Sequence, residues 1–117
     1  MNDADPDLKA LDDLAHGYGQ RLRLVRMALG LSAKALAEEC GVSPQRWSHW
    51  ENERHAPIFH IMLRLKLRRR IPLDWIYAAD PDGLPAGLVR DMLALEPKDE
   101  ITEALQALRT KLHIWQG

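Results

Sequence analysis

The sequence predicts an all-α protein, with a five-helix domain followed by a two-helix extension. Apolar residues recur at spacings of three and four along most of the 117 residues, which is the period of one helix face. Glycine and proline divide these stretches into segments of helical length, and no stretch alternates as a β-strand does. We therefore expect a domain at 16–80, preceded by an acidic tail or short helix at 1–15 and followed by a helical extension at 81–117.

The first main helix is expected to follow a solvated tail at residues 1–7. The tail leads into a short amphipathic segment with the apolar residues Leu8, Leu11 and Leu14. The first main helix begins at residue 18 or 20 and ends at Leu29, where Gly30 supplies a stop. Its inward-facing residues are expected to be Leu22, Val25, Arg26 and Leu29.

Two short helices joined by a glycine turn come next. Ser32 is placed to cap the first helix, which ends at Cys40. Gly41 can take the positive φ that a tight turn requires, and Ser43 caps a second helix whose first residue is Pro44. Two short helices joined in this way form a helix-turn-helix unit.

The second of these helices has two distinct faces. Trp47, Trp50 and Arg54 follow one another at spacings of three and four and mark one face. The polar residues largely off that line are Gln45, Arg46, Ser48, His49 and Asn52. This polar face is free to contact a partner.

The remaining helices are expected at 58–69, 73–79, 85–95 and 98–115. The helix at 58–69 has Ile61, Met62 and Leu65 on its inward side, with Leu67 as a further candidate for that side, and Pro72 opens the next helix. A turn cluster at 80–83 marks the boundary between the domain and the extension.

The net charge of −1 hides a strong segregation along the chain. Residues 1–15 carry −4, residues 16–72 carry +7 and residues 73–117 carry −4. A basic middle between acidic ends suits docking to a polyanion. No run of 18 apolar residues occurs and the N-terminus lacks the features of a signal peptide, so we expect a cytoplasmic protein without a membrane span.

The central stretch resembles the Cro and lambda-repressor-like helix-turn-helix proteins, also called the xenobiotic-response-element family. The residues that carry the resemblance are Ala37, Gly41, Val42, Ser43, Trp47, Trp50, Glu51, Pro57 and the run Ile71 to Ile76. The resemblance covers roughly residues 18–79. Two positions depart from it. Ala33 stands where a glutamine often contacts DNA, and Glu53 replaces a frequent glycine and is expected to bring a carboxylate near the phosphates.

This resemblance implies a sequence-specific regulator of transcription, a bacterial or phage repressor that binds double-stranded DNA. It also places a paired arginine and glutamate at Arg26 and Glu51. An arginine among the apolar residues of the first main helix needs an anionic partner if it is buried. We expect this ion pair to fix the recognition helix.

The candidate DNA contacts fall into two groups. The N-terminal residues of a recognition helix read base edges in the major groove, here Pro44, Gln45, Arg46 and His49. The candidate phosphate contacts are Ser32, Lys34, Ser43, Arg54 and Arg21. The alternative is that these are ordinary solvated surface residues. The basic stretch from Arg64 to Arg70 is equally consistent with phosphate contact and with a solvated helix end.

The sequence does not predict an enzyme, a cofactor or a metal site. His49, His55, His60 and Cys40 have no spacing typical of metal ligands. No nucleophile motif and no glycine-rich phosphate loop is present. Cys40, the single cysteine, is expected to be a buried structural thiol.

The last predicted helix carries an apolar seam at spacings of four, three, four and three. Its residues are Ile101, Leu105, Leu108, Leu112 and Trp115. We expect this seam to form a homodimer, because one recognition helix reads only a few base pairs. The alternative is that the seam folds back on its own domain against Leu88, Met92 and Leu95.

Two other functions compete with regulation. One is an antitoxin or protein-interaction module, whose acidic C-terminal region masks a basic toxin and which binds DNA secondarily. The other is a helix-turn-helix scaffold that has lost DNA binding, which Ala33 and Glu53 would favour. Binding to its own promoter without a partner would distinguish a regulator from an antitoxin.

Overall fold

The structure, a computed structural model, describes residues 6–112, apart from the side chains of Pro6, Leu11, Asp13 and Leu14. This part of the chain contains eight helices and no strand, which confirms the all-α fold. The helices are α1 (Pro6–Ala15), α2 (Tyr18–Ala28), α3 (Ala33–Cys40), α4 (Pro44–Glu51), α5 (Phe59–Arg69), α6 (Leu73–Ala78), α7 (Ala86–Leu93) and α8 (Thr102–Leu112). None of them has the length and apolar character that a membrane span requires.

Helices α2 to α6 correspond to the five helices expected in the domain, and the two ends of the chain differ from expectation. α1 is a ten-residue helix that begins at Pro6, inside the stretch predicted to be a solvated tail. Proline at a helix start and Asp7 in the first turn both favour this earlier beginning. α8 begins at Thr102 instead of residue 98, after a turn in which Ile101 N donates to Lys98 O at 2.8 Å.

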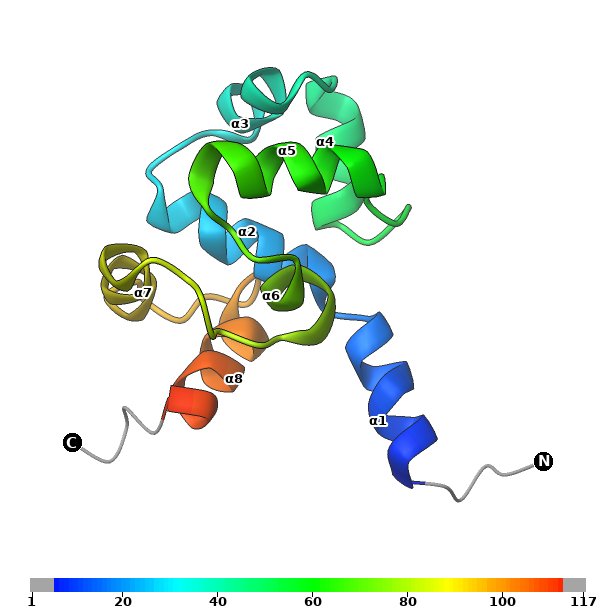
Figure 1. Ribbon diagram of the computed structural model, residues 1–117, viewed down its shortest axis with the longest axis vertical. Coiled ribbons are helices and arrows are strands. Elements are labelled where there is room, and N and C mark those ends of the chain that lie inside the picture. Colours follow the sequence, from blue (N-terminus) through cyan, green and yellow to red (C-terminus); the bar gives the residue numbers. More distant parts are fainter. Residues whose placement is uncertain (1–5, 113–117) are drawn as a thin grey trace.

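Helix α2 lies at the centre of the molecule. Figure 1 shows α3, α4 and α5 on one side of it and α6, α7 and α8 on the other. α2 packs against α4, α6, α7 and α8, so Leu22, Leu24 and Val25 are all fully buried. The amphipathic pattern predicted Leu22 and Val25 but not Leu24, because it assumed that one side of α2 would face solvent.

Three residues of the predicted seam belong to this core, so for them the alternative of packing within one chain replaces the predicted dimer contact. Ile101, Leu105 and Leu108 are completely buried within one chain. α8 packs on α2 and α7, where Leu88 and Met92 are also buried. Without α7 and α8, one side of α2 would expose apolar residues to water, and the extension of the same chain covers that side.

The predicted seam has two further residues. Leu112 is partly buried against the core. Trp115 lies outside the described residues. A polar contact reinforces the packing of α8, since Gln20 Oε1 on α2 accepts a hydrogen bond from Ala104 N at 3.0 Å and so caps the first turn of α8.

Candidate nucleic-acid interface

The turn between α3 and α4 has the local geometry expected from the sequence. Ser32 Oγ accepts from Ala35 N at 3.0 Å, and Ser43 Oγ accepts from Arg46 N at 3.2 Å. Each hydroxyl therefore caps the helix that follows it. Between the two helices Gly41 has a φ of 77°, in the left-handed region that favours glycine. These local contacts set the direction in which α4 leaves the turn.

The inner face of α4 is anchored by tryptophan. Trp47 and Trp50 are buried, and their rings are tilted by 54° with centroids 5.7 Å apart. Tilted aromatic pairs at this distance add a favourable interaction to the burial of their surface. The orientation of α4 about its own axis is consequently fixed, with its other face turned outward.

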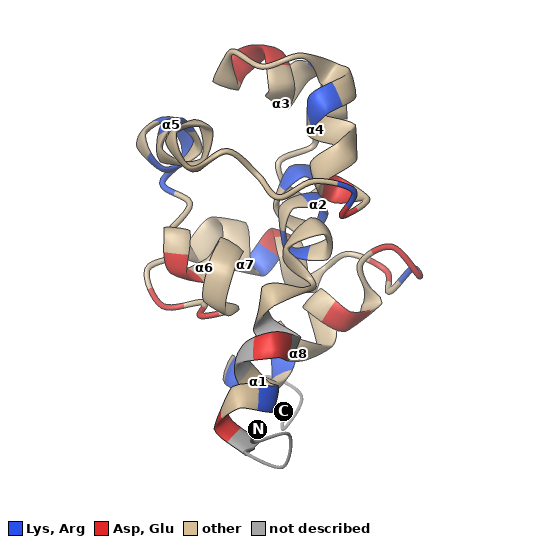
Figure 2. Cartoon of the chain, turned by 90° about the vertical axis from the view of Figure 1, so that its right-hand side faces the viewer, with Lys and Arg blue, Asp and Glu red and all other residues tan. Residues whose placement is uncertain are grey.

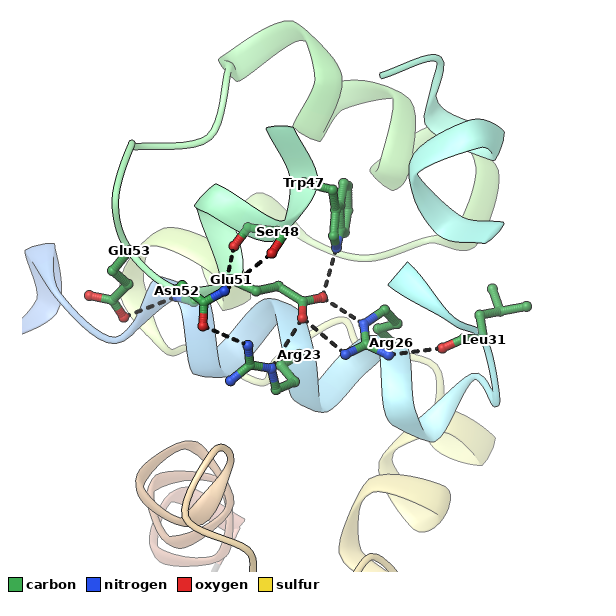
Figure 3. A network of polar contacts seen from close by, with 9 residues as sticks. Arg23, Arg26, Leu31, Trp47, Ser48, Glu51, Asn52 and Glu53 are labelled. Carbon is green, nitrogen blue, oxygen red and sulfur yellow. Dashed lines mark hydrogen bonds and ion pairs between the residues drawn. The ribbon is translucent and has the colours of Figure 1, made fainter. Parts of the chain in front are cut away.

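The expected ion pair between Arg26 and Glu51 is present, and it belongs to a larger network (Figure 3). Arg26 Nε lies 2.6 Å from Glu51 Oε2, and Arg26 Nη2 lies 3.0 Å from Oε1. Arg23 Nε and Trp47 Nε1 also donate to this carboxylate, at 3.1 and 2.7 Å. The side chain of Glu51 is only 3% exposed. Its carboxylate thus joins α4 to two arginines of α2, and the sequence had indicated only one of them.

Glu53 does not face the phosphates, contrary to the expectation from the sequence. Its Oε2 atom accepts from Gly17 N at 2.9 Å and from Gly19 N at 3.2 Å, at the start of α2. The first turn of a helix has free amides and a positive dipole end, which attract a carboxylate. Glu53 has a φ of 58°, so the backbone after α4 turns in the left-handed region at this residue. The end of the recognition helix is thereby joined to the start of α2.

The outer face of α4 brings the four predicted base-reading residues together. Pro44, Gln45 and Arg46 are exposed and His49 is half-buried. Gln45, Arg46 and His49 line a surface hollow of about 510 Å³, together with Ser43, Trp50, His55, Ala56 and Ile58. The rings of His49 and His55 meet edge to face with their centroids 5.3 Å apart. Within the described residues, no three His, Cys, Asp or Glu side chains are grouped so that they could hold a metal ion.

Four of the five candidate phosphate contacts are exposed at or near the two helices. Ser32 and Lys34 lie at the start of α3, Ser43 lies at the start of α4, and Arg54 follows its end. Free amides in the first turns of α3 and α4 add to the attraction for an anion. Among the described helices, α2 and α5 carry the most Lys and Arg residues, while α4 carries one, Arg46 (Figure 2).

Arg21 is not a phosphate contact. The residue is 6% exposed, and its Nε atom donates to Ile76 O at 2.8 Å while Nη2 donates to His16 O at 3.3 Å. Burial lowers the pKa of Arg21, and the negative charge of Glu53 opposes this shift. Its guanidinium is occupied by backbone carbonyls because the start of α2 is covered by the end of α6.

Two members of the basic stretch on α5 have structural roles that neither interpretation of the sequence included. Arg64 Nη1 donates to Cys40 O at the end of α3, at 2.9 Å. Arg69 forms two hydrogen bonds of 2.7 and 2.6 Å with Glu39, and this pairing lowers the pKa of the Glu39 carboxyl. Both arginines tie α5 to α3. Cys40 is buried, as expected, and burial raises the pKa of its thiol.

A comparison with protein families agrees with this arrangement. Residues 19–80, more than half of the chain, match the model of a helix-turn-helix domain. No curated protein and no solved structure gave a match. The matched segment begins and ends with the five helices α2 to α6 that position the outer face of α4. The chain therefore belongs to the helix-turn-helix family, of the Cro and xenobiotic-response-element type.

Proposed function

We propose that this protein is a sequence-specific regulator of transcription that binds double-stranded DNA and acts as a repressor. The observation that carries the proposal is the outer face of α4, on which Gln45, Arg46 and His49 surround one hollow. The inner face of the same helix is held by the Glu51 network, so the outer side chains project from a rigid support. Rigid presentation of a few polar side chains is what base recognition requires.

The side chains on α4 suit particular base edges in the major groove. Gln45 can form two hydrogen bonds with adenine, and Arg46 can form two with guanine. Pro44 has no polar side-chain atom and offers an apolar contact to a thymine methyl. His49 lies one turn further along α4 and would reach the next base pair. A protein bound in this groove would exclude other proteins from the same site, which is sufficient for repression.

Phosphate contacts would set the position of α4 on the duplex. Ser32 and Ser43 lie at helix N-termini, whose amides can bind phosphate oxygens. Lys34 and Arg54 are exposed and add positive charge on either side. These contacts carry no sequence information but account for the general attraction to DNA.

We further propose that two copies bind one pseudo-palindromic site. A single recognition helix reads few base pairs, and a second copy doubles the sequence that is read. Ile101, Leu105 and Leu108 are buried in each chain, so the two copies would meet through another surface. The same burial favours regulation over an antitoxin role, because these three apolar residues of the acidic C-terminal region are not available to a toxin.

Selection from a library of random duplexes, followed by measurements on the selected site, tests the proposal. The wild type should enrich a symmetric site, and Gln45→Ala should lose discrimination at one base pair per half-site by about 1 to 3 kcal/mol. Gln106→Ala is the matched control, since Gln106 is an exposed glutamine on α8 and should leave discrimination unchanged. Equal affinity of the wild type for selected and random duplexes would reject sequence-specific recognition.

A further inference from the structure

The outward face of α5 carries an apolar stripe that has no part in the core. Phe59, Leu63 and Leu67 follow one another at spacings of four, and they are 58%, 36% and 82% exposed. The opposite side of α5 packs inward through Ile61, Met62 and Leu65. α5 is therefore apolar on two sides, and only one of them is used to build the domain. A continuous row of large exposed apolar side chains marks an interaction surface.

Basic residues lie beside the carboxyl-terminal part of this stripe. Lys66 and Arg70 are exposed and surround a hollow of about 440 Å³ next to Leu67, with Pro72 and Gly83 on its other side. Among the described residues, neither Lys66 nor Arg70 forms an ion pair. α5 itself contains no acidic residue. The edge of the stripe thus presents positive charge without a matching carboxylate.

The basic residues of the same segment are divided by function. Arg64 and Arg69 point to α3 and are held by Cys40 O and Glu39. Lys66 and Arg70 are exposed, and among the described residues their side chains form no hydrogen bond or ion pair. The positive charge of Lys66 and Arg70 is therefore available to a partner, whereas Arg64 and Arg69 hold α5 in place.

We propose that the stripe is the docking site for an acidic amphipathic helix of a partner protein. Apolar side chains one turn apart along α5 match the spacing of three and four that an amphipathic helix presents. Acidic residues flanking the apolar face of the partner would meet Lys66 and Arg70. None of the stripe residues lines the hollow beside the recognition helix, so the partner can bind while α4 is in contact with DNA.

Neither a second copy nor the chain's own acidic helix fits this surface as well. Two α5 helices packed antiparallel would set Lys66 and Arg70 against the positive amino-terminal pole of the other helix, where there is no carboxylate. Packed parallel, they would bring like charges together. The acidic helix α1 lies at the opposite end of the molecule from α5, as both views show (Figures 1 and 2).

A display library of helical 16-residue peptides, selected on the full-length protein, tests both the apolar and the charged part of the site. The wild type should enrich peptides with apolar residues at spacings of three and four and a net negative charge. The double variant Lys66→Glu with Arg70→Glu should enrich basic peptides with the same apolar spacing. Identical peptides from the two proteins, or no enrichment on the wild type, would overturn the proposal.

A selected acidic peptide then serves as the probe for single variants. Leu67→Glu should weaken its binding by at least about tenfold, whereas Gln106→Ala on α8 should have no effect. Equal binding to Leu67→Glu and to the wild type would place the peptide elsewhere and overturn the proposal. Circular dichroism should give the same melting curve for every variant, because the substituted residues are exposed. Arg70 has a positive φ, but a glutamate can adopt this conformation, as Glu53 does in the same chain.

Sedimentation distinguishes a partner helix from a second copy as the occupant of the stripe. Peptide binding measured with and without the selected duplex separates this inference from the proposed function. If the wild type forms a dimer that Leu67→Glu dissociates, the stripe is occupied by a second copy and the proposal is wrong. The selected peptide should bind equally well with and without the selected duplex. Loss of peptide binding on DNA would contradict the proposed position of the site, while absence of any selected duplex would affect only the proposed DNA function.

Discussion

The Glu51 carboxylate accepts hydrogen bonds from three side chains, Arg23, Arg26 and Trp47, and so its loss affects more partners than the loss of any one donor. Glu51 is almost fully buried, while each arginine keeps 17% of its side chain exposed. An arginine released from the network can reach water, but the carboxylate cannot. Loss of the Glu51 carboxylate is therefore expected to lower the stability more than loss of either arginine.

Glu51→Ala should lower the free energy of unfolding by about 3 to 5 kcal/mol, because it leaves two cations and a buried indole N–H without their shared acceptor. Arg26→Met should cost less, about 1 to 3 kcal/mol, since Arg23 and Trp47 still donate to the carboxylate. Chemical denaturation measures both. Arg90→Met on the exposed face of α7 is the control. A loss below about 0.5 kcal/mol for Arg26→Met would show that the pair contributes nothing to folding.

Gly19→Ala should destabilise the protein through a collision between α2 and the end of α4. A Cβ atom on Gly19 would lie 2.3 Å from Glu51 O and 2.8 Å from Glu53 Cγ. Because one of these atoms belongs to the backbone, the helices must move apart, at a cost of about 3 kcal/mol. Gly30→Ala is the control: it meets nothing within 4 Å and pays only for its φ of 73°, about 1 to 2 kcal/mol. Equal losses in thermal denaturation would mean that α2 and α4 are not tightly packed.

Residues could be assigned from the sequence where their partners are close in the chain. Ser32 and Ser43 each cap an amide three residues away, so the local pattern was sufficient. Arg21 and Glu53 were misassigned because their partners are distant: Ile76 is 55 residues from Arg21, and Gly17 is 36 residues from Glu53. A charged residue in a basic segment looks the same in sequence whether it faces a phosphate or a buried carbonyl.

At the scale of the helix, an apolar pattern indicates that one face is covered but not what covers it. The seam of α8 has the spacing of a coiled coil, and it is covered by α2 and α7 of its own chain. α5 shows the converse: Ile61, Met62 and Leu65 are buried as predicted, but the placement of Leu67, a further candidate for the inward side, is wrong, since it is 82% exposed and belongs to an outward stripe. The apolar patterns predicted the helices and most of their inner faces. Which two faces pack together depends on contacts between distant parts of the chain, and a local pattern does not show these.

Leu105→Ala should therefore destabilise the whole domain, by about 2 to 5 kcal/mol, because it opens a cavity at a fully buried position. Its neighbour Gln106 is exposed on the same helix, and Gln106→Ala should change the stability by less than about 0.5 kcal/mol. Thermal denaturation and sedimentation together decide the role of α8. A variant that remains folded and has half the mass of the wild type would show that Leu105 lies between two copies.

For the whole molecule, the distribution of charge matters more than the total. The formal net charge is −1, yet residues 16–72 carry +7 and include the recognition helix and the residues beside it. Because a bound duplex is drawn to the local charge and screened from distant charge by salt, the acidic segments at both ends reduce its attraction only weakly. A net charge near zero is compatible with DNA binding when the charges are segregated along the chain in this way.

Lys34→Ala and Arg54→Ala should each reduce the slope of log affinity against log salt by about one unit, if each residue touches one phosphate. Lys111→Ala removes the same charge from the exposed surface of α8 and is the control. Titrations of a duplex at several salt concentrations measure the three slopes. The same change of slope for Lys111→Ala as for Lys34→Ala would show that net charge, and not contact, governs the affinity.

The contact between Gln20 and Ala104 also has a consequence for the synthesis of the protein. These residues are 84 positions apart, and they join the central helix to the last described one. On the ribosome the helix-turn-helix segment emerges first, while α7 and α8, which cover α2, are still to be made. Until α7 and α8 have been made, α2 lacks the cover that they provide. The central helix is therefore completely buried only after a segment far along the chain has been synthesised, whereas its contacts with the recognition helix can form earlier.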